Sequence, residues 1–176
     1  MNRIPAFLFF FFCFVIPDLF SQDDPYLLNE IKPGKEVNCM SYFPDGKKML
    51  IGLMDGTAEV IDLESGKTLL SFTEHWKGIM DVEVDPKAKF FITAGDNSIK
   101  VWDMEGNEVS RMPNHTTTIY SIDLHPSGKY LVSGAVNKNF NFWDVKTGEV
   151  LHYMKGHTDV AMAVCFSNDG KLIASG

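Results

Sequence analysis

One group of residues recurs along this chain at a nearly constant interval, and that repetition restricts the possible folds more than any other feature. The recurring residues are His75, His115 and His157, and the pair Trp102-Asp103, which returns as Trp143-Asp144. The interval is about forty residues. A unit of that length is too thin to bury an apolar face alone, so neighbouring units must stack to form a common core.

Each unit carries the alternation typical of strands. Between 79 and 84, for example, apolar and acidic residues take turns along the chain, so that they point to opposite faces. Runs of this kind are separated by Gly, Pro, Asn and Asp, which indicates antiparallel strands joined by tight turns. The pattern predicts an all-β chain, a β-propeller of four-stranded antiparallel blades. Its repeats fall at about 36–72, 75–112, 115–154 and 157–176, which gives three full blades plus half of another.

The number of units is too small for a closed ring. Propellers close with about four to eight blades, and three and a half leave the ring incomplete. We therefore expect the sequence to be a fragment of a longer propeller. The alternative is a naturally short chain that completes its ring by forming an oligomer.

The first 21 residues do not follow the repeat. Arg3 precedes the apolar run Ala6–Ile16, and Pro17-Asp18 ends it. This layout is typical of a secretory signal peptide, with residues 22–176 as the mature propeller domain. The run of about eleven residues falls short of the ~20 that span a bilayer as a helix. We therefore expect an exported protein without stable membrane insertion after cleavage, the alternative being an uncleaved N-terminal signal anchor.

Charge and cysteine content restrict the possible partners. The net charge is −7, and a nucleic-acid partner would require a basic face that the sequence does not contain. Cys39 and Cys165 fall in the first strands of units three blades apart, too distant for a disulfide. We expect two buried free thiols there, and their spacing resembles neither a metal site nor a redox motif.

Short motifs within the repeats carry a family resemblance. They are Gly156-His157-Thr158-Asp159, Ser133-Gly134, Val101-Trp102-Asp103 and Phe142-Trp143-Asp144. With these motifs, residues 26–176 resemble a WD-repeat (Trp-Asp repeat) β-propeller. The resemblance implies a structural hydrogen-bond set in each blade that runs from histidine through a strand hydroxyl and a turn aspartate to tryptophan.

That set transfers to three of the four units. Its members are His75, Thr93, Asp96 and Trp102 in the second unit, His115, Ser133, Asn137 and Trp143 in the third, and His157 and Ser175 in the fourth. The first unit has Pro33, Ile51 and Ile61 at the equivalent places, so we expect apolar packing to hold it. Buried indole, hydroxyl and imidazole groups are costly unless paired, which makes the histidines structural.

The sequence contains no catalytic constellation. Asp81 and Glu83 share one face of a strand and could act as a carboxylate pair, but a solvated charged rim strand is the commoner explanation, and we expect it here. Glycine-rich phosphate loops and the Gly-x-Ser-x-Gly nucleophile turn are absent from the sequence. The sequence therefore predicts no enzyme activity, no cofactor and no metal.

The loops that join successive units offer the most useful surface, because binding residues concentrate on loops held by a rigid scaffold. The candidate partner-binding residues are Trp76, Lys77, Thr116, Asn139 and Asp159. An aromatic ring beside a cation can anchor an interface, although Trp76 could instead pack against a neighbouring blade. We expect a non-catalytic scaffold for a protein or peptide. The alternatives are the propeller portion of a larger exported enzyme with its catalytic part beyond residue 176, or a purely structural envelope protein.

Overall fold

Strands and turns make up the described chain. The computed structural model describes residues 31–73, 75–113, 115–136 and 140–176, and these contain fourteen strands and no helix. The strands are β1 (Val37–Tyr42), β2 (Lys48–Leu53), β3 (Thr57–Asp62), β4 (Thr68–Thr73), β5 (Ile79–Val84), β6 (Phe90–Gly95), β7 (Ser98–Asp103), β8 (Glu108–Met112), β9 (Ile119–Leu124), β10 (Tyr130–Ala135), β11 (Phe140–Asp144), β12 (Val150–Met154), β13 (Val164–Phe166) and β14 (Ile173–Ser175).

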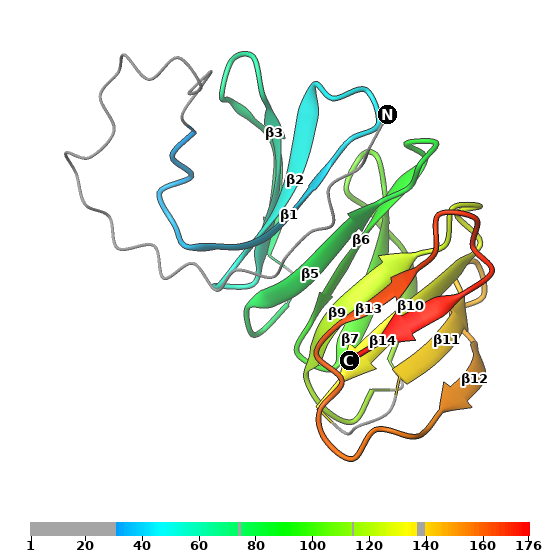
Figure 1. Cartoon of the computed structure of the whole chain (residues 1–176). Coiled ribbons are helices and arrows are strands. Elements are labelled where there is room, and N and C mark those ends of the chain that lie inside the picture. The colour runs from blue at the N-terminus through cyan, green and yellow to red at the C-terminus, as the bar shows by residue number, and fades with distance from the viewer. Residues whose placement is uncertain (1–30, 74, 114, 137–139) are drawn as a thin grey trace, which may run out of the picture. The chain divides into compact units, whose positions relative to one another are not determined.

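These strands form three four-stranded sheets and one two-stranded sheet, each antiparallel and each in chain order. The sheets are β1–β4, β5–β8, β9–β12 and β13–β14 (Figure 1). The predicted all-β fold of three full blades plus part of another is confirmed. The predicted signal peptide at 1–21 lies outside the described residues.

An aspartate closes the turn between the third and fourth strands of the sheets. In the second sheet, Asp103 Oδ1 accepts hydrogen bonds from the backbone N–H groups of Glu105 and Asn107, at 3.0 and 2.8 Å. The Asn107 side chain also donates to Asp103, and this bond is the largest cause of the lowered pKa of the Asp103 carboxyl. The aspartate that follows tryptophan in the repeat therefore serves the turn locally.

The turn between the first and second strands requires a left-handed backbone. Gly46, Gly128 and Gly170 occupy this place with φ of 67°, 74° and 73°, and Ala88 takes the same conformation with φ of 51°. A side chain makes this conformation unfavourable. The turn geometry is therefore kept in the second sheet even where glycine is missing.

The core lies between successive sheets. First strands β1, β5, β9 and β13 are neighbours in that order (Figure 1). Leu50 and Val60 of the first sheet pack with Val82 and Phe91 of the second. A second cluster joins buried side chains of the second sheet, among them Ile92, to Leu131 and Trp143 of the third. Burial of these faces supplies the main favourable term for stacking.

The two cysteines differ from the prediction of buried thiols. Both are free, but Cys39 is only partly buried and Cys165 is exposed, so the prediction is wrong for Cys165. Cys165 on β13 is equivalent to Asp123 on β9. In the earlier sheets, this face of the first strand is covered by the next sheet. No further described sheet covers that face of β13. Cys39 Sγ lies 3.7 Å from the carbonyl oxygen of Ile79, and burial raises its pKa.

Candidate functional site

A buried chain of polar groups connects the strands of the second sheet. The Trp102 indole N–H donates to Thr93 Oγ1 at 2.9 Å, and the same hydroxyl lies 2.8 Å from His75 Nε2. His75 Nδ1 lies 3.3 Å from Asp96 Oδ2, a contact that falls short of hydrogen-bond geometry. The side chains of these four residues thus form one buried chain that links the loop before β5, the strands β6 and β7, and the turn between them.

The protonation of this set follows from its burial. Burial lowers the pKa of His75, against the charge of Asp96, so the imidazole is neutral at pH 7. Burial opposes ionisation of Asp96, but hydrogen bonds from the Ser98 side chain and from the backbone N–H groups of Asn97 and Ser98 outweigh it and lower its pKa. We assign the imidazole proton to Nδ1, because two lone pairs facing each other across the contact with Asp96 would repel.

The third sheet repeats the arrangement. Ser133 Oγ accepts from the Trp143 indole at 2.8 Å and lies 2.7 Å from His115 Nε2. The rings of His115 and Trp143 also meet, with centroids 5.3 Å apart. Burial lowers the pKa of His115 to about 4. Asn137, the predicted fourth member, lies outside the described residues.

The first and last sheets carry less of the set. His157 Nε2 lies 2.8 Å from Ser175 Oγ, which places the two predicted residues of the fourth unit together. In the first sheet, Ile51, Leu53 and Ile61 form an apolar cluster instead. The expected apolar packing of this unit is therefore present.

The polar set lies directly beneath the loops between sheets. The Trp76 backbone N–H donates to Asp96 Oδ2 at 3.4 Å, so the loop is tied to the turn between β6 and β7. A Cβ added to Gly78 would lie 2.9 Å from the carbonyl oxygen of Met54, which brings the turn between β2 and β3 to the same place. Loops and turns from two adjacent sheets thus form one surface, which we call the loop end.

Trp76 is the most exposed aromatic residue of the described loop end. Its side chain is 70% exposed, so it does not pack against a neighbouring blade. Lys77 Nζ stands 4.5 Å from the centroid of its ring, close enough for a cation–π contact. Thr116 and Asp159 are also exposed, and Asn139 lies outside the described residues.

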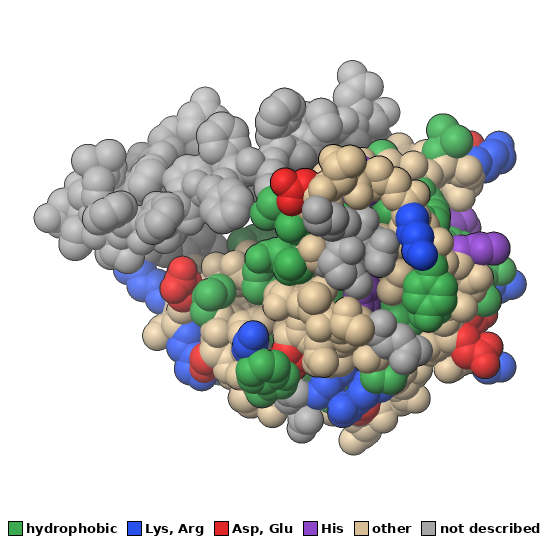
Figure 2. Space-filling model, turned by 90° about the horizontal axis from the view of Figure 1, so that it is seen from below, with side chains coloured by type: hydrophobic (Ala, Val, Ile, Leu, Met, Phe, Trp, Pro, Cys, Tyr) green, Lys and Arg blue, Asp and Glu red, His purple; other side chains and the backbone are tan. Residues whose placement is uncertain are grey.

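The described part of the face seen in Figure 2 mixes charges and apolar groups. Figure 2 shows one face on which, over the described residues, apolar side chains lie among basic and acidic ones rather than beside a field of one sign. The described residues include no group of three or more His, Cys, Asp or Glu that could hold a metal ion, and no helix long and apolar enough to cross a membrane.

The repeats correspond to a known family. A family model described as WD domain, G-beta repeat matches residues 66–103, 106–144 and 148–176, which together make up more than half of the chain. The chain belongs to the WD-repeat family.

Curated WD-repeat relatives match over most of the chain's length. Pre-mRNA-processing factor 19 of Oryza sativa is 26% identical over 82% of this chain. Periodic tryptophan protein 2 of Arabidopsis thaliana is 25% identical over 88%, and nuclear distribution protein PAC1 of Coccidioides posadasii is 27% identical over 58%. The chain spans 28%, 18% and 26% of these relatives, less than a third of each.

These relatives contradict the prediction of export. Their names refer to pre-mRNA processing and nuclear distribution, not to a secreted or envelope protein. The prediction rested only on the order of residues near the start of the chain, where a basic residue precedes an apolar run. The localisation prediction is wrong on this comparison.

The acidic pair on β5 also differs from expectation. Asp81 and Glu83 are partly buried between β5 and β9 rather than on a solvated rim. Asp81 Oδ2 accepts the backbone N–H of Ile122 at 2.8 Å. Burial raises the pKa of Asp81 to about 6, and burial together with the charges of Asp81 and Asp123 raises that of Glu83 to about 8.

Proposed function

We propose that this WD-repeat chain is a non-catalytic scaffold that binds a protein or peptide at its loop end, with Trp76 as the anchor. The observation that carries the proposal is the 70% exposure of Trp76 above a buried polar set. Large aromatic side chains dominate the energetics of protein interfaces when a partner desolvates them. An exposed indole on a fixed loop also loses little conformational entropy on binding.

The rigidity of the loop supports this role. Trp76 is held through its backbone by Asp96, and Asp96 in turn accepts hydrogen bonds from Ser98 at 3.0 and 2.9 Å. Lys77 covers one side of the indole ring, which leaves the rest free for a partner. Thr116 and Asp159 lie in equivalent loops of the following junctions and extend the proposed contact surface.

The test is affinity capture with quantitative mass spectrometry, using the full chain as bait. We expect a protein that is retained by the wild type and lost with Trp76→Ala. The purified partner should then bind the variant about 30-fold more weakly in a direct titration. Leu172→Ala is the matched control, because Leu172 is 71% exposed but lies by the turn between β13 and β14. Equal retention by wild type and Trp76→Ala would contradict the proposal.

A further inference from the structure

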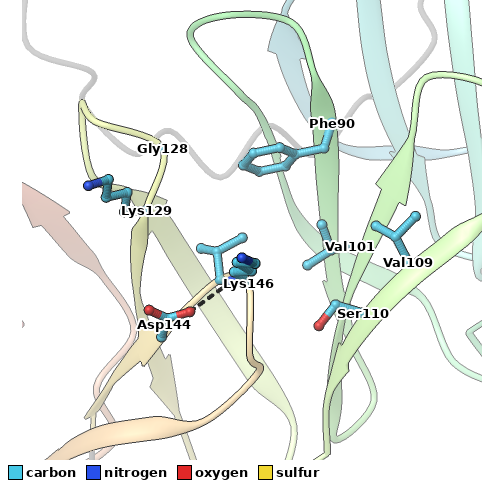
Figure 3. A pocket seen from close by; sticks show the side chains of 9 residues that line it. Phe90, Val101, Val109, Ser110, Gly128, Lys129, Asp144 and Lys146 are labelled. Atoms are coloured by element: carbon cyan, nitrogen blue, oxygen red, sulfur yellow. Dashed lines mark hydrogen bonds between the residues drawn. The ribbon is translucent and has the colours of Figure 1, made fainter.

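A pocket opens between the second and third sheets at the end opposite the loop end. It has a volume of about 440 Å³, within the range of about 300–1,000 Å³ common for ligand sites. Its apolar lining comes from Phe90, Val101, Val109 and Val145, and Ser110, Gly128, Lys129, Asp144 and Lys146 complete it. Figure 3 shows the second-sheet residues facing the two turns of the third sheet across the pocket.

The pocket exists because two side chains are smaller here than at the preceding junction. Ser110 pairs with Val101 just as Leu70 pairs with Val60 in the first sheet. Leu70 reaches the turn of the second sheet, where it lies 3.0 Å from the Cβ position of Gly106. Ser110 meets the equivalent turn only with its hydroxyl, 3.4 Å from the Cβ position of Gly148.

The second smaller side chain is Val145, and it also leaves space at this junction. Met104 follows the turn aspartate of the second sheet and packs, partly buried, against the core between the first two sheets. Val145 occupies that place in the third sheet, and its side chain is shorter. At the first junction Leu70 and Met104 thus occupy the space between the sheets, whereas at the second Ser110 and Val145 leave a pocket.

The charges at the rim of the pocket also differ from those at the first junction. Lys129 and Lys146 border the pocket and are both exposed, whereas the equivalent residues of the first junction are Lys89 and Glu105. Asp144 supplies one negative charge against these two positive charges, and its Oδ1 accepts the backbone N–H groups of Lys146 and Thr147, both at 2.9 Å. Among the described residues neither lysine forms an ion pair within 4.0 Å.

We propose that this pocket binds an acidic peptide segment through one apolar side chain. The apolar side chain enters between Phe90 and Val145, and carboxylates before and after it approach Lys129 and Lys146. An apolar floor supplies burial, and the paired positive charges select an acidic sequence and steer its approach. This site stands apart from the partner proposed for the loop end, because it lies at the other end of the sheets.

The test uses isotope-labelled full chain and a blocked pentapeptide, acetyl-Glu-Asp-Leu-Asp-Glu-amide, in an NMR titration. We expect saturable shifts at the backbone amides of Ser110, Lys129 and Val145. Replacing the central leucine of the peptide by glycine, or its four acids by lysine, should each weaken binding by roughly tenfold or more.

Two variants restore the residues of the first junction. Ser110→Leu fills the pocket and Lys146→Glu restores the opposite rim charges, and each should weaken peptide binding about tenfold. Lys146→Glu changes only an exposed turn residue, so it keeps the test valid if Ser110→Leu lowers stability. Lys171→Glu, an equal charge change at an exposed turn of the fourth unit, should leave binding unchanged.

Several results would overturn the proposal. They are an absence of saturable binding, equal affinity of the wild type and both variants, and equal affinity for the leucine and glycine peptides. Octanoate serves as an apolar anion that is not a peptide, and its binding in the pocket without binding of the pentapeptide would also overturn it. Trp76→Ala should leave the titration unchanged, which separates failure here from failure of the loop-end proposal.

Discussion

Glu83 keeps its proton at a pH where an ordinary glutamate has lost it. Burial between β5 and β9 is the main cause, and the negative charges of Asp81 and Asp123 add to it, raising its pKa from 4.5 to about 8. A group whose pKa is higher in the folded than in the unfolded chain binds its proton more tightly when folded. Its contribution to stability is therefore complete below about pH 4.5 and is lost as the pH rises to about 8.

Glu83→Gln should remove this loss, because the amide does not ionise. We expect the variant to gain stability relative to the wild type between pH 5 and pH 8.5, by about 1–3 kcal/mol after allowance for partial exposure. Urea denaturation at the two pH values measures the difference, with the exposed turn variant Glu64→Gln as control. A wild-type-to-variant difference that stays constant with pH would show that Glu83 titrates normally.

Single residues also mark the limit of prediction from sequence. The alternation of Asp81 and Glu83 with valines indicated a strand correctly, but not what would cover its acidic face. Their burial depends on β9, which follows some forty residues later, and so does the hydrogen bond from Ile122. Conversely, the placement of Asp103 and of the turn at Ala88 follows from neighbours a few residues away, and local sequence signals such turns well.

At the scale of strands, the Thr93 hydroxyl joins three parts of the second sheet. It accepts from Trp102 on β7 and faces His75 in the loop before β5, while its own backbone belongs to β6. The family model matches 66–103, a span that begins before β4 of one sheet and ends with β7 of the next. The sequence repeat thus spans the junction between two sheets. The polar set holds together the loop and strands of the sheet that follows this junction.

Thr93→Val tests this role with little change in side-chain volume. The substitution leaves the buried Trp102 indole N–H and His75 Nε2 without their shared partner, and we expect it to lower the free energy of unfolding by about 2–4 kcal/mol. Ile51→Val is the matched control, because Ile51 holds the same place in the first sheet without a polar partner. That change should cost only about 0.5–1.5 kcal/mol. Equal losses in the two variants would mean that the hydrogen bonds at Thr93 add nothing beyond packing.

The pocket at the second junction shows what strand patterns leave open. The sequence correctly predicted the four-stranded units on either side of it. It did not reveal the opening, because the opening depends on a difference between Ser110 and Leu70 that has meaning only when both junctions are compared in space. An alignment of the repeats by their turn aspartates would have been the signal to follow.

Over the whole described chain, stacked sheets present two ends with different surfaces. The loop end carries Trp76 and Lys77 above the buried polar sets, and the other end carries the tight turns and the pocket rimmed by Lys129 and Lys146. Family membership and the order of strands follow from sequence, because both rest on repeated local signals. The direction in which an exposed Trp76 points does not, since the same sequence permits packing against a neighbouring sheet.

The most direct test of the account is amide hydrogen exchange of the full chain, with and without the protein captured through Trp76. The account predicts that the partner slows exchange at 75–78 and 95–98, which belong to the loop end, and leaves the turns at 86–89 and 126–129 unchanged. Protection confined to those turns, with none at 75–78, would place the binding surface at the opposite end and contradict the proposed function.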